Sequence, residues 1–306
     1  MNTAPIVLFV YKRAEHTRKC LEALNHNEGI ENTDLIIYSD GPREEKDDIS
    51  VKEVREYIKM FAQVSSFRHV EIVESPVNKG LARSIISGVS NVMNQYGKAI
   101  VVEDDLVTST DFWRFMDGAL QYYENYPQIG SVSGCTYPIK YLEDYKKDIY
   151  VIRKGECWGW ATWKERWDEV DWDVCDFTEY KKNRKLRKQF NSLECGLDHM
   201  LISQMTGKID SWAVRWCYHL FKRKLLTVYP AVSRTYNIGM DGTGEHCPEA
   251  TDYEFKLYTG NFQCNYEIQE VNVEIEKQVA IFEKQRSGWI VTRIIERIFN
   301  RKRSKL

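Results

Sequence analysis

The chain has 306 residues, of which 43% are hydrophobic and 29% are charged, and its formal net charge is −2. These values are ordinary for a globular protein and exclude a disordered chain, a collagen and a coiled-coil rod. No apolar run reaches the ~20 residues that a membrane-spanning helix needs, so we expect no transmembrane segment. The short apolar stretch after Met1 lacks a preceding basic region, which favours a buried strand over an export signal.

The charges and the cysteines limit the cellular setting. Segment 284–306 carries a net charge of +7, which leaves −9 for the rest of the chain. A general nucleic-acid binder is expected to be basic over its body, so we expect no nucleic-acid partner. The eight cysteines stand singly, and none has the CxxC spacing of a structural zinc site. This pattern favours reduced thiols in a cytoplasmic protein.

The first half of the chain alternates strand-like and helix-like runs. Short β-branched runs predict strands at Ile6–Val10, Leu35–Tyr38, Val70–Val73 and Ala99–Val102. Apolar residues at helical spacing predict helices at Glu15–Leu24, Val51–Phe61, Leu81–Met93 and Phe112–Tyr123. This order predicts an α/β fold with a mixed, mainly parallel sheet that helices cover on both faces. In such sheets ligands bind at the carboxyl ends of the strands, where Asp40 and Glu103–Asp105 fall.

The second half departs from this rhythm at about Ile129. Short strands are predicted at Ser131–Ser133 and Tyr150–Ile152, and a basic, solvated helix at 178–190. Segment 209–231 reads as a helix, and 232–246 as a turn-rich loop. We therefore expect one domain in two halves, 1–128 for a donor and 129–283 for an acceptor, followed by a basic tail at 284–306.

The tail segment Gly288–Leu306 combines apolar and basic residues at roughly helical spacing. The apolar positions are Trp289, Ile290, Ile294, Ile295, Ile298 and Phe299, with Arg293, Arg297, Arg301 and Lys302 between them. Such a C-terminal amphipathic helix is suited to an anionic membrane surface, which would hold the protein at the inner face of the cell membrane. The alternative is a helix docked on the body of the protein.

The most informative stretch is the acidic triplet Glu103-Asp104-Asp105 at the end of a predicted strand. Three clustered carboxylates at a buried strand end repel one another unless a cation compensates. Their hard oxygen atoms suit Mg²⁺ or Mn²⁺, which can stabilise a nucleoside-diphosphate leaving group. The alternative is a solvated loop whose acids cap the helix that begins at Phe112.

Other polar residues are predicted to share this sheet edge. Lys79 and Arg83 lie in Asn78-Lys79-Gly80-Leu81-Ala82-Arg83, a strand-to-helix turn where the glycine lets a ligand approach and the cations can meet phosphate. Tyr11 and Arg13 follow the first strand, and Asp40 follows the second. Each residue alone is more often structural, but together they describe a pocket for a nucleoside diphosphate.

These motifs resemble a known group of enzymes. PIVLFVYKR, IIYSDGP, NKGLARS and IVVEDDL, in this order, look like the donor half of a GT-A glycosyltransferase. The chain is most similar to the N-acetylglucosaminyltransferase I group and to related bacterial family 2-like sugar transferases. The resemblance extends to the Pro230–Thr235 loop and covers most of 4–246, and it implies a GT-A, Rossmann-like fold.

The resemblance also implies roles for individual residues. Asp105 would hold the metal directly, Asp104 would reach the ribose or sugar, and Glu103 would lie close by. Asp40 would face the nucleobase. A uridine nucleotide and inversion at the anomeric carbon are favoured by the resemblance alone.

An inverting transfer needs a base that takes the proton from the attacking acceptor hydroxyl. In the group the base lies in a W-D-D-W run, and the matching Ile209–Trp212 keeps one aspartate, Asp210. Asp210 is the first candidate, although it is equally suited to cap the next helix. Asp198 is the second candidate, for which a structural role is favoured, and Glu156 is the third.

Two further segments are candidates for ligand contacts. His246 ends a Gly-rich loop, where it could bind the metal or phosphate while the loop excludes water; the alternative is an exposed surface histidine. The run Cys157–Trp163 resembles the CWGWATW stretch of bacterial sugar transferases. Most of its tryptophans belong in a core, but we expect Trp158 and Trp160 to face an acceptor sugar.

The sequence therefore predicts a metal-dependent glycosyltransferase that moves a sugar from a nucleoside-diphosphate donor to a hydroxyl of a glycan or lipid-linked glycan. A nucleotidyltransferase is a rival, but it usually has an early Gly-rich loop, and Tyr11–Glu15 contains no glycine. A non-catalytic glycan-binding protein is another rival, and it would not need the acidic triplet.

Overall fold

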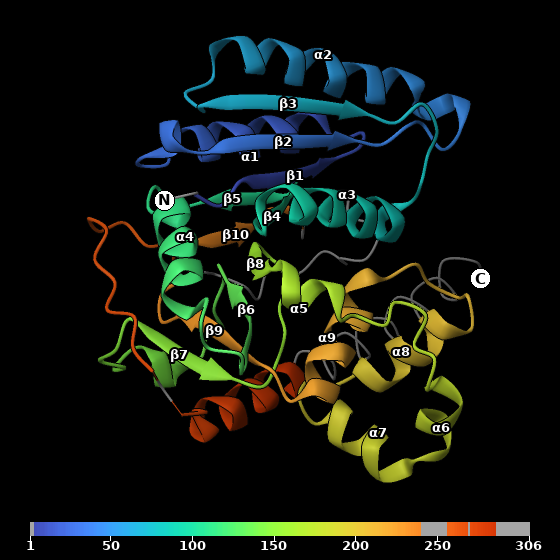
Figure 1. Cartoon of the computed structure of the whole chain (residues 1–306), viewed down its shortest axis with the longest axis vertical. Helices are drawn as coiled ribbons and strands as arrows, with labels where there is room; N and C mark the ends of the chain where they lie inside the picture. Colours follow the sequence, from blue (N-terminus) through green and yellow to red (C-terminus); the bar gives the residue numbers. More distant parts are fainter. Residues whose placement is uncertain (1–2, 240–255, 269, 286–306) are drawn as a thin grey trace, which may run out of the picture.

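The computed structural model describes residues 3–239, 256–268 and 270–285, arranged around one large sheet (Figure 1). Within these residues the sheet has eight strands in the order β3-β2-β1-β4-β8-β6-β9-β7. Their bounds in this order are His69–Glu74, Asp34–Ser39, Ile6–Val10, Lys98–Glu103, Trp160–Trp163, Ile129–Ser133, Leu226–Pro230 and Ile149–Ile152. Strands β3, β2, β1 and β4 are mutually parallel, β8 is antiparallel to β4 and β6, and β7 is antiparallel to β9.

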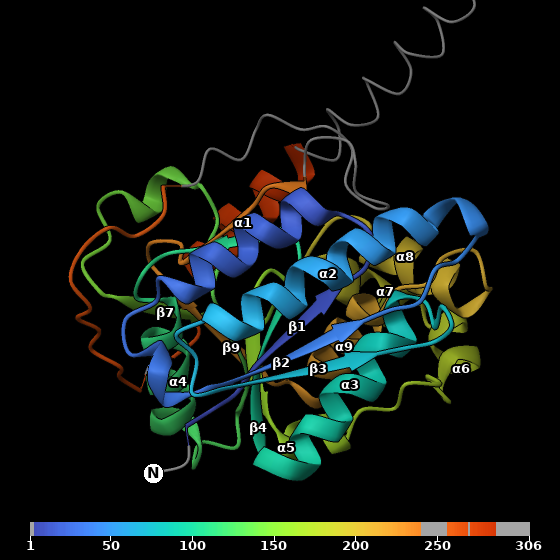
Figure 2. The same cartoon turned by 90° about the horizontal axis from the view of Figure 1, so that it is seen from above.

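Helices cover both faces of this sheet (Figure 2). One face packs against α1 (Ala14–Asn25), α2 (Asp48–Val64) and α4 (Phe112–Tyr123). The other packs against α3 (Leu81–Tyr96), α5 (Lys164–Asp168) and α9 (Trp212–Arg223). Alternate residues of β1 serve the two cores, since Leu8 lies in the first and Val7 in the second. The predicted α/β class with a mainly parallel, doubly covered sheet is therefore confirmed.

The second half contains strands that the sequence analysis missed. Segment 209–231 was expected to be a helix, but α9 ends at Arg223 and β9 follows it. The helix ends because Lys224 adopts a left-handed conformation with φ of 54°. The basic helix expected at 178–190 is two short helices, α6 (Phe177–Lys182) and α7 (Arg184–Asn191), of which the second is capped by the Asn183 side chain.

The sheet passes without interruption from the first half of the chain to the second. Val101 of β4 pairs with Trp160 of β8, and β8 pairs in turn with β6. Residues 273–285 form a helix whose apolar side chains, including Ile275 and Val279, pack against Tyr150 and Tyr229 of the far strands. The division at residue 128 stays a prediction.

The sequence predicted no transmembrane segment and an amphipathic helix in the C-terminal tail. Among the described residues, no helix has both the length and the apolar character needed to cross a bilayer. The amphipathic helix predicted at 288–306 lies outside the described residues.

Candidate functional site

The carboxyl ends of β1, β2 and β4 meet at one edge of the sheet. Val10 at the end of β1 pairs with Ser39 of β2, and Phe9 pairs with Glu103 of β4. The segments that leave these strands therefore start side by side. They carry Tyr11 and Arg13, Asp40, and the acidic triplet, so the structure brings these predicted donor residues to the same edge.

Arg13 is the direct partner of the acidic triplet. Its Nη2 donates to Asp104 Oδ1 and, over 2.9 Å, to Asp105 Oδ2. The other terminal nitrogen, Nη1, is buried and has no hydrogen-bond partner among the described residues. A cation of the protein thus compensates the clustered carboxylates, which the sequence analysis had assigned to a metal or to solvent.

The three acids of the triplet differ in their electrostatics. Burial is the main cause that raises the pKa of Glu103 to about 8, and the charges of Asp105 and Asp104 add to it. A hydrogen bond with Trp212 lowers this pKa in part. Burial also raises the pKa of Asp104 to about 6, although the charge of Arg13 opposes this shift. In the absence of a bound cation, the charged form of Glu103 is therefore less favoured than that of Asp104.

Asp105 borders the segment that precedes the predicted Gly-rich loop. Its carbonyl oxygen accepts from Ile238 N over 2.8 Å, just after β10 (Thr235–Asn237) pairs with β5 (Leu106–Thr108). A Cβ built on Gly239 would lie 2.4 Å from Asp105 Oδ2, so only glycine leaves this oxygen clear. The sequence indicated Gly239 as the first residue of the Gly-rich loop, but not its position beside Asp105, which follows from the β10–β5 pairing. His246 lies outside the described residues.

Asp40 holds the turn before α3. Its Oδ1 accepts from the backbone N–H groups of Gly41 and Lys79, each over 2.9 Å, and its Oδ2 accepts from Gly80 N over 3.1 Å. Gly80 has φ of +79°, a conformation that favours glycine. The side chains of Lys79 and Arg83 are exposed beside this turn. Asp40 thus shapes the turn, and its predicted contact with a nucleobase stays a prediction.

Asp210 approaches the same turn from the second half of the chain. Its Oδ2 accepts from Ala82 N of α3 over 3.4 Å, which is a long and weak bond. It does not cap its own helix, since Ser211 accepts from Val214 N and is the N-cap of α9. The capping role considered from the sequence is therefore wrong for α9. Asp210 instead contacts the first turn of α3, beside the sheet edge that carries Asp40.

Tyr11 is fixed by a contact that the sequence did not indicate. Its hydroxyl donates to Asp47 Oδ2 over 2.8 Å and accepts from Arg43 N over 2.9 Å. Burial and the bond to Asp47 raise the pKa of Tyr11 to about 12. Lys12 also pairs with Asp47, over 2.8 Å. The segment after β1 is thereby tied to the residues before α2.

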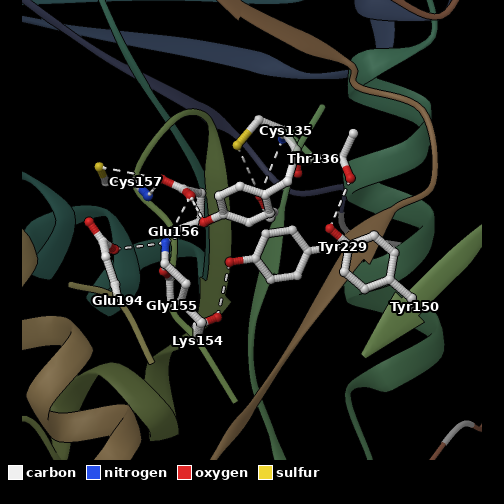
Figure 3. A network of polar contacts seen from close by, with 11 residues as sticks. Cys135, Thr136, Tyr150, Lys154, Gly155, Glu156, Cys157, Glu194 and Tyr229 are labelled. Carbon is white, nitrogen blue, oxygen red and sulfur yellow. Dashed lines mark hydrogen bonds and ion pairs between the residues drawn. The ribbon is translucent and has the colours of Figure 1, made fainter. Parts of the chain in front are cut away.

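Glu156 belongs to a buried polar network (Figure 3). It accepts from Tyr137 Oη over 2.7 Å and from Cys157 N over 2.9 Å, and it pairs with Lys154 over 3.4 Å. Lys154 is only 5% exposed and also pairs with Glu194 over 2.9 Å. Although burial alone would raise the pKa of Glu156, the charge of Lys154 outweighs it and lowers that pKa. These fixed contacts favour a structural role for Glu156 over that of a base.

Asp198 lies on α8 (Leu197–Met205) within the α6–α8 unit. Both of its oxygens accept from Arg187, over 2.9 Å each, and Oδ1 also accepts from Tyr180 Oη over 2.9 Å. The bond from Arg187 lowers the pKa of Asp198. These contacts join three helices and give Asp198 a structural role.

Replacing Asp198 by asparagine tests this role. We expect Asp198→Asn to lower the free energy of unfolding by about 1–3 kcal/mol and to leave the turnover rate unchanged. Because the folded-state pKa is lowered, the pair contributes stability above the ordinary aspartate pKa and loses it as the pH falls through the folded value. Urea unfolding of both proteins at neutral and acidic pH measures this, and a variant that folds normally but is inactive would contradict it.

The two tryptophans predicted to face an acceptor lie in different environments. Trp160 is 0% exposed, and its ring stacks on Trp167 and Trp212 with centroids 5.5 and 5.0 Å apart. No ring face is left for a sugar, so the prediction for Trp160 is wrong. Trp158 is partly exposed and packs against the edge of the first core, and its role stays a prediction.

In the described part of the chain, no three His, Cys, Asp or Glu side chains form a group that could hold a metal ion. The acidic triplet supplies fewer ligands than that, since Glu103 turns to Trp212. A cation bound at Asp104 and Asp105 would therefore need further oxygen atoms from a small molecule bound beside it.

Comparisons with known proteins give distant likenesses. No model of a protein family matches the chain, and no curated protein matches it in sequence. The solved structures that it resembles include S. aureus TarS, with TM-score 0.33, 7% identity and coverage of 42% of this chain and 21% of that one. The S. aureus TarS 1-349 structure has TM-score 0.37, 7% identity and coverage of 53% and 47%.

A third similar structure is the mannosyltransferase PcManGT from Pyrobaculum calidifontis, in complex with GDP-Man and Mn²⁺. It has TM-score 0.41 and 10% identity over 72% of this chain and 68% of that one. The chain spans less than half the length of the two TarS chains. Likenesses at this level assign neither a family nor an activity, so the functional argument rests on the residues of the sheet edge.

Proposed function

We propose that this protein is a GT-A-type glycosyltransferase that moves a sugar from a nucleoside-diphosphate donor, with a UDP-sugar favoured, to a hydroxyl of a glycan or lipid-linked glycan. One observation carries the proposal: the carboxyl ends of three parallel strands bring Arg13, Asp40 and the pair Asp104–Asp105 to one edge. Ligands bind at such edges in open α/β sheets. A role of the 288–306 tail at the inner face of a membrane stays a prediction.

The edge offers groups for each part of the donor. Lys79 and Arg83 expose cationic side chains beside this edge, and such side chains can bind phosphate. Arg13 has a buried N–H group without an acceptor among the described residues, which a phosphate oxygen would satisfy. Asp40 and Tyr11 border the same edge and are the candidates for contacts with the base and ribose.

A divalent cation, Mn²⁺ or Mg²⁺, fits this edge at Asp105. The carboxylate oxygen is a hard ligand, and Gly239 leaves the space beside it that a Cβ would fill. Asp105 and Asp104 would hold the ion together with phosphate oxygens of the donor. When bound, the ion would stabilise the charge of the departing diphosphate.

Asp210 is our candidate for the base that takes the proton from the acceptor hydroxyl. Its carboxylate approaches this edge from the second half of the chain, and its bond to Ala82 N is long enough to leave the group available. The fixed contacts of Asp198 and Glu156 favour Asp210 over both alternatives.

We expect Asp210→Asn to reduce the transfer rate about 100-fold or more, because the amide cannot accept the proton. The amide oxygen still accepts from Ala82 N, so the melting temperature should change little. Ser211→Ala is the matched control: it removes the N-cap of α9, costs about 1 kcal/mol of stability and leaves the rate intact. Steady-state rates and melting curves are compared for the wild type, Asp210→Asn and Ser211→Ala. A wild-type rate in Asp210→Asn would exclude Asp210 as the base.

The proposal is tested first by thermal stabilisation. The purified protein is melted with UDP-, GDP-, CMP- and dTDP-sugars, each with Mn²⁺ and with EDTA. A ligand at ~100 times its dissociation constant adds about 2.7 kcal/mol to the free energy of unfolding, which gives a clear shift. We expect one nucleotide class to stabilise the protein in a metal-dependent way. No shift with any donor would remove the basis of the proposal.

A glycan-binding protein without catalysis now has less support. That alternative depended on tryptophans that offer a ring face to a sugar, and Trp160 is enclosed by other rings. The remaining exposed ring of the segment is that of Trp158.

A further inference from the structure

Arg13 occupies the oxygen atoms that the proposed function assigns to a cation. Its Nη2 donates both to Asp104 Oδ1 and to Asp105 Oδ2. The exposed fractions of the three side chains are 22% for Arg13, 6% for Asp104 and 14% for Asp105. Since water screens this contact poorly, the acidic pair is already partly neutralised by a group of the protein.

A divalent cation at Asp105 Oδ2 would therefore meet a competitor. An oxygen that accepts from a guanidinium donates less electron density to a metal, and two cations in a poorly solvated site repel each other. Arg13 has to leave the carboxylates, or the cation binds weakly. The competition is intramolecular, so it operates whenever the ligand is absent.

The second terminal nitrogen of Arg13 is a hydrogen-bond donor that a ligand could satisfy. Nη1 is buried and lacks an acceptor among the described residues. A buried donor without a partner is costly, which favours movement to a site that satisfies it. The oxygens of a diphosphate are suitable acceptors because the planar guanidinium matches phosphate with two parallel hydrogen bonds.

We propose, on the basis of the function proposed above, that Arg13 keeps the divalent cation off Asp104 and Asp105 until a nucleoside diphosphate takes over the guanidinium. Cation and nucleotide then bind with positive cooperativity, because each finds its partners free once Arg13 has turned to the phosphate. Without nucleotide, the protein has low affinity for the cation. Arg13 thus acts on metal binding as well as on the donor.

Direct measurement of Mn²⁺ binding tests this inference without reference to activity. Free Mn²⁺ is followed by electron paramagnetic resonance in titrations of the whole chain, alone and with UDP or GDP. We expect Arg13→Gln to bind Mn²⁺ about tenfold more tightly than the wild type in the absence of nucleotide. Nucleotide should strengthen Mn²⁺ binding about tenfold in the wild type and much less in the variant.

Two variants serve as controls. Arg18→Gln removes an arginine of α1 whose surface partners are Glu15 and Glu22, and this variant should bind Mn²⁺ like the wild type. Arg13→Lys keeps the positive charge and should retain most of the competition. Melting curves show which variants are folded. If Arg13→Gln does not fold, the wild type alone decides: Mn²⁺ binding that neither UDP nor GDP strengthens overturns the inference.

The outcomes separate this inference from the proposed function. Equal or weaker Mn²⁺ binding by a folded Arg13→Gln protein overturns the role of Arg13 and leaves donor binding untouched. If neither the wild type nor any variant binds Mn²⁺ but a nucleotide still stabilises the wild type, the metal site is excluded, and the proposed role of Arg13 is excluded with it. Absence of nucleotide binding as well would remove the proposed function itself.

Discussion

Replacing Asp105 by asparagine is expected to reduce sugar transfer about 100-fold or more while the protein stays folded. The substitution keeps the shape of the side chain and removes the charge that the diphosphate-bound cation would contact. It also replaces the ion pair with Arg13, whose Nη2 lies 2.9 Å from Asp105 Oδ2, by at most a neutral hydrogen bond, which leaves Asp104 as the charged partner of Arg13. Initial rates with the donor that stabilises the wild type, at several Mn²⁺ concentrations, measure the effect.

Asp144→Asn is the control for this experiment. Asp144 is exposed in the segment before β7, and the same change of charge there should alter neither the rate nor the melting temperature. If Asp105 acts by holding the cation, higher Mn²⁺ should restore part of the lost rate in the variant. A folded Asp105→Asn protein with a wild-type rate would show that the acidic pair is structural and that Arg13 alone compensates it.

The first half of the fold was predictable because each element there satisfies its own local pattern. Strand β1 is a continuous apolar run, and α3 begins directly after Gly80 and keeps apolar residues on one face. In a parallel sheet this local information also fixes where the strand ends meet. The position of Asp40 near the acidic triplet therefore followed from the sequence.

The second half was less predictable because its strands are made by tertiary contacts. β8 consists of Trp160–Trp163, which the sequence indicated as part of a mostly buried tryptophan cluster and not as a strand. Its strand character depends on pairing with both β4 and β6. β9 follows α9 after a left-handed Lys224, a residue that carries no sequence signal for such a turn. The same limit explains why the enclosure of Trp160 was missed.

The electrostatics of the site were partly hidden from the sequence for a similar reason. The sequence suggested that clustered carboxylates need a cation, but it could not show that Arg13 supplies one across two strands. The resemblance gave the three acids different roles, but nothing in the sequence indicated that their electrostatics differ. The contact of Glu103 with Trp212 separates it from Asp104 and Asp105, which pair with Arg13. Such differences arise only when segments distant in the sequence pack together.

Replacing Trp160 by alanine is expected to lower the free energy of unfolding by about 3–5 kcal/mol. The ring is fully buried and packs on three others, Trp167, Trp212 and Trp216, with centroids 5.0–5.6 Å away. Its loss leaves a cavity between β8 and helices α5 and α9, which rigid aromatic neighbours fill poorly. Urea unfolding followed by circular dichroism measures the change.

Two further variants make the stability experiment specific. Trp160→Phe should cost less, about 1–2 kcal/mol, because the indole N–H of Trp160 has no hydrogen-bond partner among the described residues and none is lost. Trp158→Ala should also be mildly destabilising, since that ring is partly exposed. Equal stability of Trp160→Ala and Trp158→Ala would contradict the assignment of Trp160 to the core.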